Sequence, residues 1–210
     1  MKNRLDHKLP PHIGYDFVTL EIADGSKVLD LGCGDGELLI KLQNEKNIVG
    51  YGVEISEDGV SKCIEKGLYC YQGDIDEGLS DYRDNSFDYV ILNQTLQSTK
   101  KPEYVMKEIM RIGKNAIVTF PNFGYINVRM QFLFTGRMPQ NVLLPFNWYE
   151  TPDIHHLTIQ DFIIYCQDNN FLIQKVKHFC VNKTGRSSLI RVLPNLLAQF
   201  GFFILGGELS

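Results

Sequence analysis

The chain has 210 residues and a mass of 24.1 kDa, with 21 basic and 25 acidic side chains and a formal charge of −4. Its five cysteines include no Cys-x-x-Cys pair, which argues against a disulfide framework and a zinc ribbon, and we expect no metal site. The chain has no Lys/Arg-rich run of the kind that favours nucleic-acid binding. Its longest apolar run, residues 202–205, is too short to cross a bilayer. Because residues 1–8 also lack the apolar segment of a secretory signal, we expect one cytoplasmic domain over residues 1–210.

Strands and helices are predicted to alternate in the first 120 residues. Helices are expected directly after a glycine-rich turn, from an N-cap at Ser56, and from Pro102, where the missing N–H of proline does no harm. This alternation is typical of an α/β, Rossmann-like fold, a mostly parallel sheet with helices on both faces. The apolar runs predict strands at residues 26–31, 49–54, 69–72, 87–93 and 115–120.

The alternation breaks after the fifth strand. Residues 121–157 contain four prolines and many aromatic side chains, and we predict an insertion there. Thr158 is expected to cap the next helix, and residues 171–176 to form another strand. The apolar tail, residues 189–205, favours a last core strand after a helical or irregular stretch, with an exposed partner interface as the alternative.

The sharpest motif is the turn between the first strand and the first helix of this series. It includes Asp30, Gly32, Cys33, Gly34 and Gly36, and its glycines allow the backbone to turn tightly and approach a ligand. An acid at the end of the second strand, about twenty residues further on, is the residue that binds the ribose hydroxyls in nucleoside sites. This spacing predicts a nucleoside site.

The charges around the turn select among nucleosides. A dinucleotide site uses Gly-x-Gly-x-x-Gly, but here the third glycine comes one position early, and Asp30 and Asp35 would repel a pyrophosphate. S-adenosylmethionine has a ribose and no phosphate, and its ammonium and sulfonium groups suit nearby carboxylates. A dinucleotide-binding oxidoreductase is therefore the weaker alternative.

This motif resembles the glycine-rich motif of class I S-adenosylmethionine-dependent methyltransferases over residues 26–120. The resemblance implies S-adenosylmethionine or S-adenosylhomocysteine as cofactor, with Asp30 and the turn near its methionine end. The other cofactor residues would then be Glu54 and Ile55 at the ribose, Asp74 and Ile75 at the adenine, and Asn93 and Gln94, after the fourth strand, at the reactive end.

A closer resemblance comes from several further segments. They lie at residues 4–6, 50–54, 73–79, 94–97, 120–124, 135–139, 144–149 and 151–155, and together they are similar to the methionine biosynthesis protein MetW family. Tyr125 and Ile126 depart from the His-Trp pair common in the family, and Asp153 stands where Asn is common.

The resemblance implies a partner as well as a fold. MetW proteins are linked to a MetX-type homoserine O-acyltransferase, so we expect a cytoplasmic, S-adenosylmethionine-binding activator of that enzyme. The alternative is an authentic methyltransferase acting on a small molecule through the insertion. For that reaction His155 and His156 are the candidate bases, although a loop histidine is more often structural.

Overall fold

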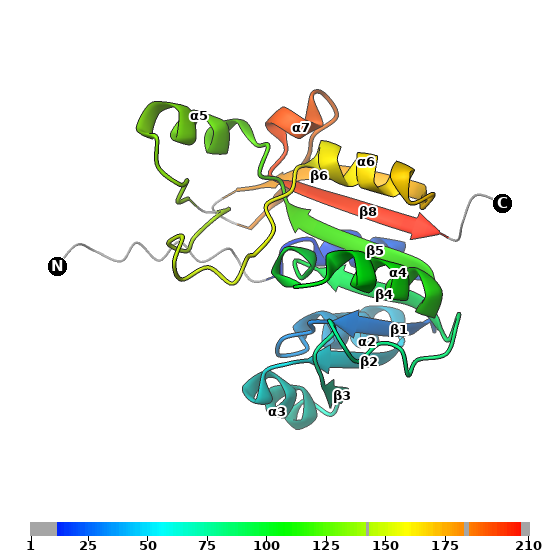
Figure 1. The fold of residues 1–210 in the computed structure, drawn as a ribbon. Coiled ribbons are helices and arrows are strands. Elements are labelled where there is room, and N and C mark those ends of the chain that lie inside the picture. Colours follow the sequence, from blue (N-terminus) through cyan, green and yellow to red (C-terminus); the bar gives the residue numbers. More distant parts are fainter. Residues whose placement is uncertain (1–11, 142, 183–184, 207–210) are drawn as a thin grey trace.

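The computed structural model describes residues 12–141, 143–182 and 185–206, so residues 4–6 of the family resemblance lie outside it. Within these residues the chain forms an eight-stranded sheet of order β3-β2-β1-β4-β5-β8-β6-β7 (Figure 1). The strands are β1 (Lys27–Leu31), β2 (Val49–Glu54), β3 (Tyr69–Gln72), β4 (Phe87–Asn93), β5 (Gly113–Pro121), β6 (Leu172–Val181), β7 (Ser187–Leu189) and β8 (Phe200–Gly206).

Strands β1 to β5 are parallel, and β8 runs antiparallel to both of its neighbours, β5 and β6. The predicted strands are confirmed: β2, β3 and β4 match residue for residue, and β1 and β5 differ by one or two residues at their ends. Strand β6 continues to Val181, beyond the predicted end at residue 176, because β7 and β8 both pair with it. The class I methyltransferase-like α/β fold is therefore present.

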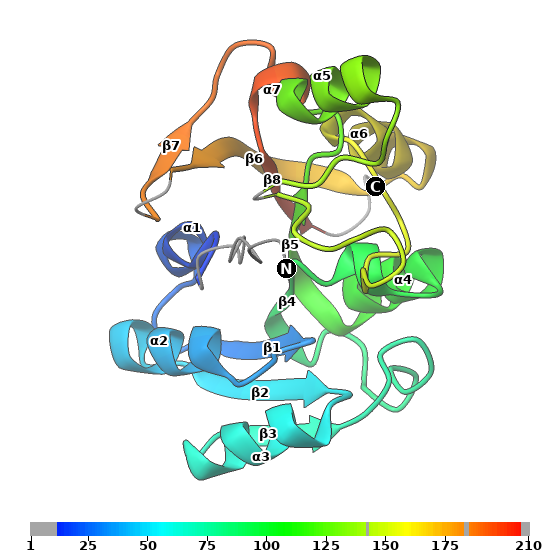
Figure 2. The ribbon, with the colours of Figure 1, turned by 90° about the vertical axis from the view of Figure 1, so that its left-hand side faces the viewer.

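Helices cover both faces of the sheet (Figure 2). Alternate residues of β1 divide between two cores: Val28 belongs to the core formed with α1, α2 and α3, and Leu29 to the core formed with α4 and α6.

No helix among the described residues is long and apolar enough to span a membrane. The helices are α1 (Tyr15–Glu21), α2 (Glu37–Lys46), α3 (Glu57–Glu65), η1 (Leu96–Ser98), α4 (Pro102–Ile112), α5 (Ile126–Thr135), α6 (Ile159–Asp168) and α7 (Pro194–Leu197).

The predicted helix starts are formed by local capping. The hydroxyl of Ser56 accepts a hydrogen bond of 3.4 Å from the N–H of Gly59, and Pro102 opens α4. Thr158 and Asp161 form a reciprocal capping box at the start of α6. These starts need only neighbouring residues, which is why the sequence predicts them.

The insertion, residues 121–157, begins with a buried anchor. The Asn122 amide donates to the carbonyls of Asn195 (3.1 Å) and Ala198 (2.8 Å), and its oxygen accepts from the N–H groups of Gly124 (3.0 Å) and Ile159 (3.3 Å). The proline spacing did not predict α5, which forms within the insertion. Figure 1 shows α5 and the loop after it beyond the end of β5, on the side where the parallel strands end.

The apolar tail divides into two parts. Strand β8 is buried along its whole length, so the core-strand interpretation is confirmed for residues 200–206. The preceding residues Leu189, Val192 and Leu193 are exposed.

Candidate cofactor site

The glycine turn connects the end of β1 to α2, and its shape requires glycine. Gly32, Gly34 and Gly36 all have a positive φ. A Cβ at Gly32 would lie 2.6 Å from the Thr95 methyl group, and one at Gly36 would collide with the side chain of Leu68. The turn therefore packs closely against both the residues after β4 and those before β3.

Glu54, the last residue of β2, is bonded to this turn. Its Oε2 accepts a hydrogen bond from the N–H of Gly34 and its Oε1 accepts one from the N–H of Ser56, both at 2.9 Å. The carboxylate is thus held in place at the open end of the sheet. A carboxylate can accept about four hydrogen bonds, so further acceptor positions remain for a ligand.

Asp30 is buried within β1, just before the turn. No described residue donates a hydrogen bond to its carboxylate. Burial, with a smaller effect from the negative charge of Glu54, raises the pKa of Asp30 to about 7. A cationic ligand beside this carboxylate would favour its ionised form.

Tyr15, at the start of α1, also belongs to this region, and sequence reasoning missed it. Burial, followed by the charges of Asp30, Glu37 and Asp35, raises the pKa of its phenol, which therefore lies near the glycine turn. The positive φ of Gly14 brings the chain into α1, and a Cβ at Gly14 would lie 3.5 Å from the Asn93 amide oxygen. The apolar spacing of residues 15–22 was the available signal for α1.

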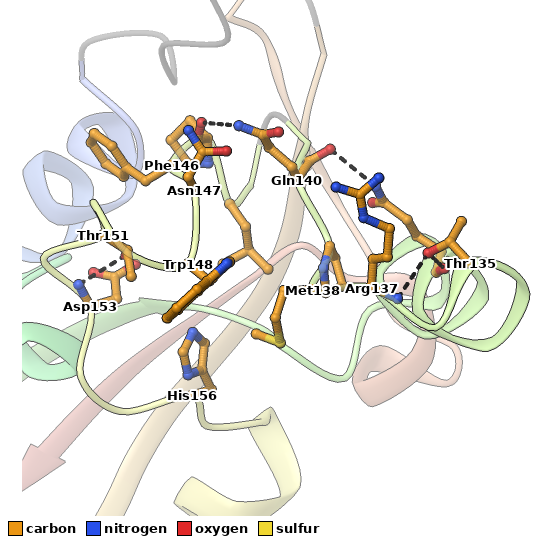
Figure 3. A pocket seen from close by; sticks show the side chains of 14 residues that line it. Thr135, Arg137, Met138, Gln140, Phe146, Asn147, Trp148, Thr151, Asp153 and His156 are labelled. Atoms are coloured by element: carbon orange, nitrogen blue, oxygen red, sulfur yellow. Dashed lines mark hydrogen bonds between the residues drawn. The ribbon is translucent and has the colours of Figure 1, made fainter.

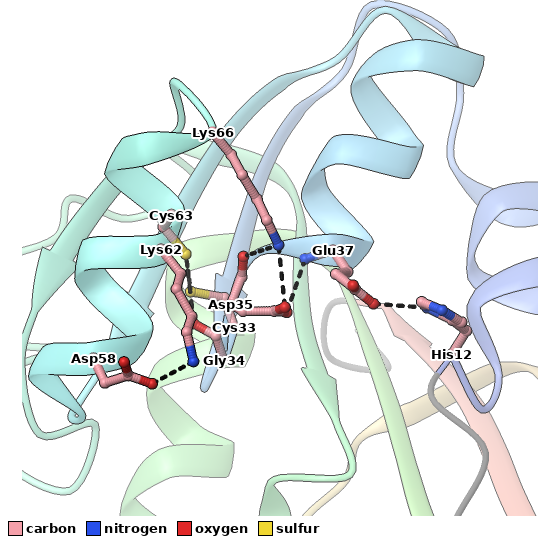
Figure 4. A network of polar contacts seen from close by, with 9 residues as sticks. All are labelled: His12, Cys33, Gly34, Asp35, Glu37, Asp58, Lys62, Cys63 and Lys66. Carbon is pink, nitrogen blue, oxygen red and sulfur yellow. Dashed lines mark hydrogen bonds and ion pairs between the residues drawn. The ribbon is translucent and has the colours of Figure 1, made fainter.

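The acids next to the turn have partners of their own (Figure 4). The Lys66 ammonium donates to the carbonyl of Asp35 (2.8 Å) and to its carboxylate (3.1 Å). Glu37 pairs with His12 at 3.1 Å. The charge of Asp35 is therefore partly balanced, and Asp30 and Glu54 are the acids left to act on a ligand.

A cleft of about 160 Å³ opens between the turn and the ends of β2 and β3. It brings together five of the predicted cofactor residues: Gly32, Glu54, Ile55, Asp74 and Ile75. The other wall of the cleft is formed by Thr95, which belongs to the segment expected at the cofactor's reactive end, and by Ser98, Thr99 and Lys100, which sequence reasoning missed.

The two aspartates after β3, Asp74 and Asp76, have different structural roles. Asp74 lines the cleft, accepts from the N–H of Asp76 (2.9 Å) and lies 3.6 Å from the Lys100 ammonium. Asp76 is buried, and its carboxylate accepts from the N–H groups of Lys100 (2.9 Å) and Lys101 (2.7 Å). Asp76 thus holds the wall of the cleft in position.

The remaining predicted cofactor residues do not line this cleft. Gln94 has a positive φ, and its side-chain amide donates to the hydroxyl of Thr119 on β5 (3.1 Å). The Asn93 amide oxygen accepts from that same hydroxyl at 2.7 Å. Cys33 is buried beneath the turn, and burial raises the pKa of its thiol, so the free side chain is a neutral thiol.

The histidine candidates lie in other cavities. His156 lines a cavity of about 690 Å³ within the insertion, where Figure 3 shows it with Trp148 and Met138. His155 and His156 both line a further cavity of about 360 Å³ beside α4 and α6. Neither histidine lines the 160 Å³ cleft, but their cavities adjoin its wall, because the Ser98 hydroxyl in that wall donates to the carboxylate of Asp153 in the larger cavity (3.2 Å).

Comparison with known proteins agrees with this architecture. The family described as "Methionine biosynthesis protein MetW" matches residues 14–205. The chain belongs to the MetW family.

A curated MetW relative joins two proteins in one chain. It is the bifunctional methionine biosynthesis protein MetXA/MetW of Rhodopirellula baltica, 36% identical over 149 residues. The match covers 67% of this chain and 24% of the relative, so this chain spans about a quarter of that protein's length.

Solved structures similar to this MetW chain show its fold alone. One is an S-adenosylmethionine-dependent methyltransferase from Thermotoga maritima, with a TM-score of 0.70 and 16% identity, covering 96% of this chain and 91% of that one. Another is the [4+2]-cyclase SpnF, with a TM-score of 0.65 and 14% identity, covering 93% and 81%. Because a methyltransferase and a cyclase share the fold, the fold does not decide whether a MetW protein transfers methyl groups.

Proposed function

We propose that this chain binds S-adenosylmethionine at the glycine turn and acts as an activating partner of a MetX-type homoserine O-acyltransferase in methionine biosynthesis. The observation that carries the cofactor assignment is the series of acids at three neighbouring strand ends: Asp30 in β1, Glu54 ending β2 and Asp74 after β3. S-adenosylmethionine supplies a ribose and two cationic groups and brings no phosphate for these acids to repel.

The cleft suits the nucleoside half of the cofactor. In this proposal Glu54 binds the ribose hydroxyls, and Asp74 with Ile75 borders the adenine. Whole-ligand pockets are typically about 300–1,000 Å³, so a cleft of about 160 Å³ holds only part of the molecule. The methionine half would then extend over the glycine turn, where its ammonium would meet Asp30 and Tyr15.

The partner assignment rests on the fused relative and on an exposed surface. In the Rhodopirellula protein a MetW portion and the portion named MetXA belong to one chain, as expected of two proteins that work together. The insertion of this chain exposes large apolar side chains, which are typical of protein interfaces. We name this set the insertion patch: Phe132, Leu133, Phe134, Trp148 and Tyr149.

An authentic methyltransferase is the second candidate, favoured by the 690 Å³ cavity in the insertion. Methyl transfer requires the acceptor in line with the sulfonium, and a base only where the acceptor loses a proton. Neither histidine lines the cleft, and the fused relative favours the activator instead.

The deciding experiment is co-expression with a MetX-type acyltransferase. We expect the two proteins to co-purify and acyl transfer to increase when this chain is present, with the increase depending on the S-adenosylmethionine concentration. A regulatory role for the cofactor is ruled out if it binds but changes neither partner affinity nor acyl transfer. Formation of S-adenosylhomocysteine with a small-molecule acceptor, and no effect on acyl transfer, would establish the second candidate.

A further inference from the structure

Three cysteine side chains converge beneath the glycine turn, although they are far apart in the sequence. Cys33 comes from the turn, Cys63 from α3 and Cys70 from β3. The Cys33 sulfur lies 3.9 Å from that of Cys63 and 3.7 Å from that of Cys70, and all three sulfurs lie within 4.8 Å of one another. Figure 4 shows Cys33 and Cys63 directed toward each other under the turn.

The surrounding backbone leaves room for these sulfurs. A Cβ at Gly52 would lie 2.5 Å from the Cys33 sulfur, and one at Gly36 would lie 2.9 Å from the Cys63 sulfur. Cys33 and Cys63 are buried, and Cys70 is partly exposed. The cluster is therefore largely buried, with Cys70 as its most exposed member.

The spacing of the sulfurs matches a shared ion. A point in the plane of three sulfurs with these separations lies about 2.2–2.5 Å from each, close to the roughly 2.3 Å of a metal–thiolate bond, and an ion that binds the sulfurs as a pyramid, out of their plane, needs them to move slightly closer together. Three thiols also form a soft ligand set, which selects thiophilic ions over hard cations. Little movement of the chain is needed to coordinate such an ion.

We propose that Cys33, Cys63 and Cys70 form a three-sulfur binding site for trivalent arsenic, supplied as arsenite. Arsenous acid, As(OH)₃, reacts with three thiols to give As(SR)₃ and three molecules of water. Three As–S bonds form, three As–O bonds break, and each thiol proton leaves with a hydroxide. No oxidant or reductant takes part, because arsenic stays trivalent.

Charge favours trivalent arsenic over Zn²⁺ and Cu⁺. Three thiolates with Zn²⁺ leave a net charge of −1, and with Cu⁺ a net charge of −2, in a largely buried site close to Asp30. Burying net charge is costly, whereas As(SR)₃ is neutral. Zn²⁺ also takes four ligands in structural sites, and the candidate ligand group among the described residues contains three.

Occupation of this site would join three separate segments. The bound ion would link the glycine turn to α3 and β3 and thereby restrict the turn that carries Gly34 and Gly36. Arsenite would then stabilise the fold whether or not the chain binds S-adenosylmethionine. The inference therefore stands apart from the proposed function.

Arsenite binding to the purified chain, in a phosphine reductant that does not compete as a dithiol would, tests the proposal. Native mass spectrometry should show one arsenic gained and three hydrogens lost, and the unfolding temperature should rise. Cys63→Ser and Cys70→Ala should each weaken binding at least ten-fold, whereas Cys166→Ser, which removes a buried thiol elsewhere, should bind like the parent. Circular dichroism establishes that each variant is folded.

Three results would overturn the assignment. The first is arsenite binding that persists unchanged in both Cys63→Ser and Cys70→Ala. The second is Zn²⁺ binding more tightly than arsenite through the same three cysteines, because the charge argument would then be wrong. Absence of any arsenic adduct on the folded parent chain would also exclude the site.

Discussion

The N–H of Gly34 donates a 2.9 Å hydrogen bond to Oε2 of Glu54, so the middle of the glycine turn is bonded to the last residue of β2. The other carboxylate oxygen accepts from the N–H of Ser56, the N-cap of α3. One side chain thus holds two backbone segments and presents the same carboxylate to the candidate cleft. The position of the ribose-binding group and the shape of the turn are therefore linked.

Replacing Glu54 by Ala should weaken S-adenosylmethionine binding. Each charge-assisted hydrogen bond to the ribose contributes roughly 1.5–3 kcal/mol, so one lost bond lowers affinity about 10- to 100-fold. Isothermal titration calorimetry measures the change. Glu65→Ala, at the exposed end of α3, is the matched control and should bind like the parent; equal affinities for all three proteins would mean that the ribose site is elsewhere.

Asp30→Asn should make stability less dependent on pH. Because the folded-state pKa of Asp30 (about 7) lies above the ordinary value of 3.8, its contribution is full below pH 3.8 and is lost as the pH rises toward 7. We expect Asp30→Asn to exceed the parent in free energy of unfolding by roughly 2–4 kcal/mol at pH 8, and by little at pH 4. Urea unfolding across this range measures it.

Asp88 provides a control of opposite sign. Its hydrogen bond from Lys114, followed by one from the N–H of Lys27, lowers the pKa of Asp88. Asp88→Asn should therefore reduce stability at neutral pH and have less effect in acid. If Asp30→Asn also destabilised the protein at pH 8, the buried carboxylate would have a favourable partner and the argument for a cationic ligand would fail.

Asn122→Ala should destabilise the fold markedly. It removes four hydrogen bonds: three join the start of the insertion to α6 and to residues 195–198, and the fourth, from the N–H of Gly124, lies within the insertion. Leaving such buried groups without partners costs about 1–3 kcal/mol each where water cannot replace them, so we expect a loss of roughly 2–4 kcal/mol in chemical denaturation. Asn127→Ala, at an exposed position of α5, should change stability by less than about 0.5 kcal/mol.

Trp148→Ala tests the insertion patch. The Trp148 side chain is 74% exposed, so its removal should leave the unfolding temperature of the isolated chain unchanged. In the proposed complex we expect at least a ten-fold loss of affinity for the acyltransferase, because interface tryptophans often contribute 2 kcal/mol or more. Surface plasmon resonance measures this loss. Tyr71→Ala, at a comparably exposed position on edge strand β3, should bind normally; the reverse pattern would move the interface to that edge.

Local sequence patterns determined most of the fold. Apolar runs and caps such as Ser56 and Thr158 depend on nearby residues, and the strands and helix starts that they predicted are present. The patterns failed where long-range contacts decide whether a helix forms. The insertion was expected to be irregular but contains α5, and α1, which packs in the same core as α2 and α3, was not predicted.

The sequence by itself determined the family, the α/β fold and the acids at the strand ends, since regular alternation of strands and helices indicates a parallel sheet and each acid follows or ends one of its strands. Only the tertiary structure decided which of these residues meet. It placed Glu54 and Asp74 in one cleft and His155 and His156 in neighbouring cavities, turned Gln94 toward Thr119, and gathered Cys33, Cys63 and Cys70. These contacts depend on how helices cross the sheet and on where glycine permits close approach. No local sequence pattern predicts contacts between residues that are distant in the chain.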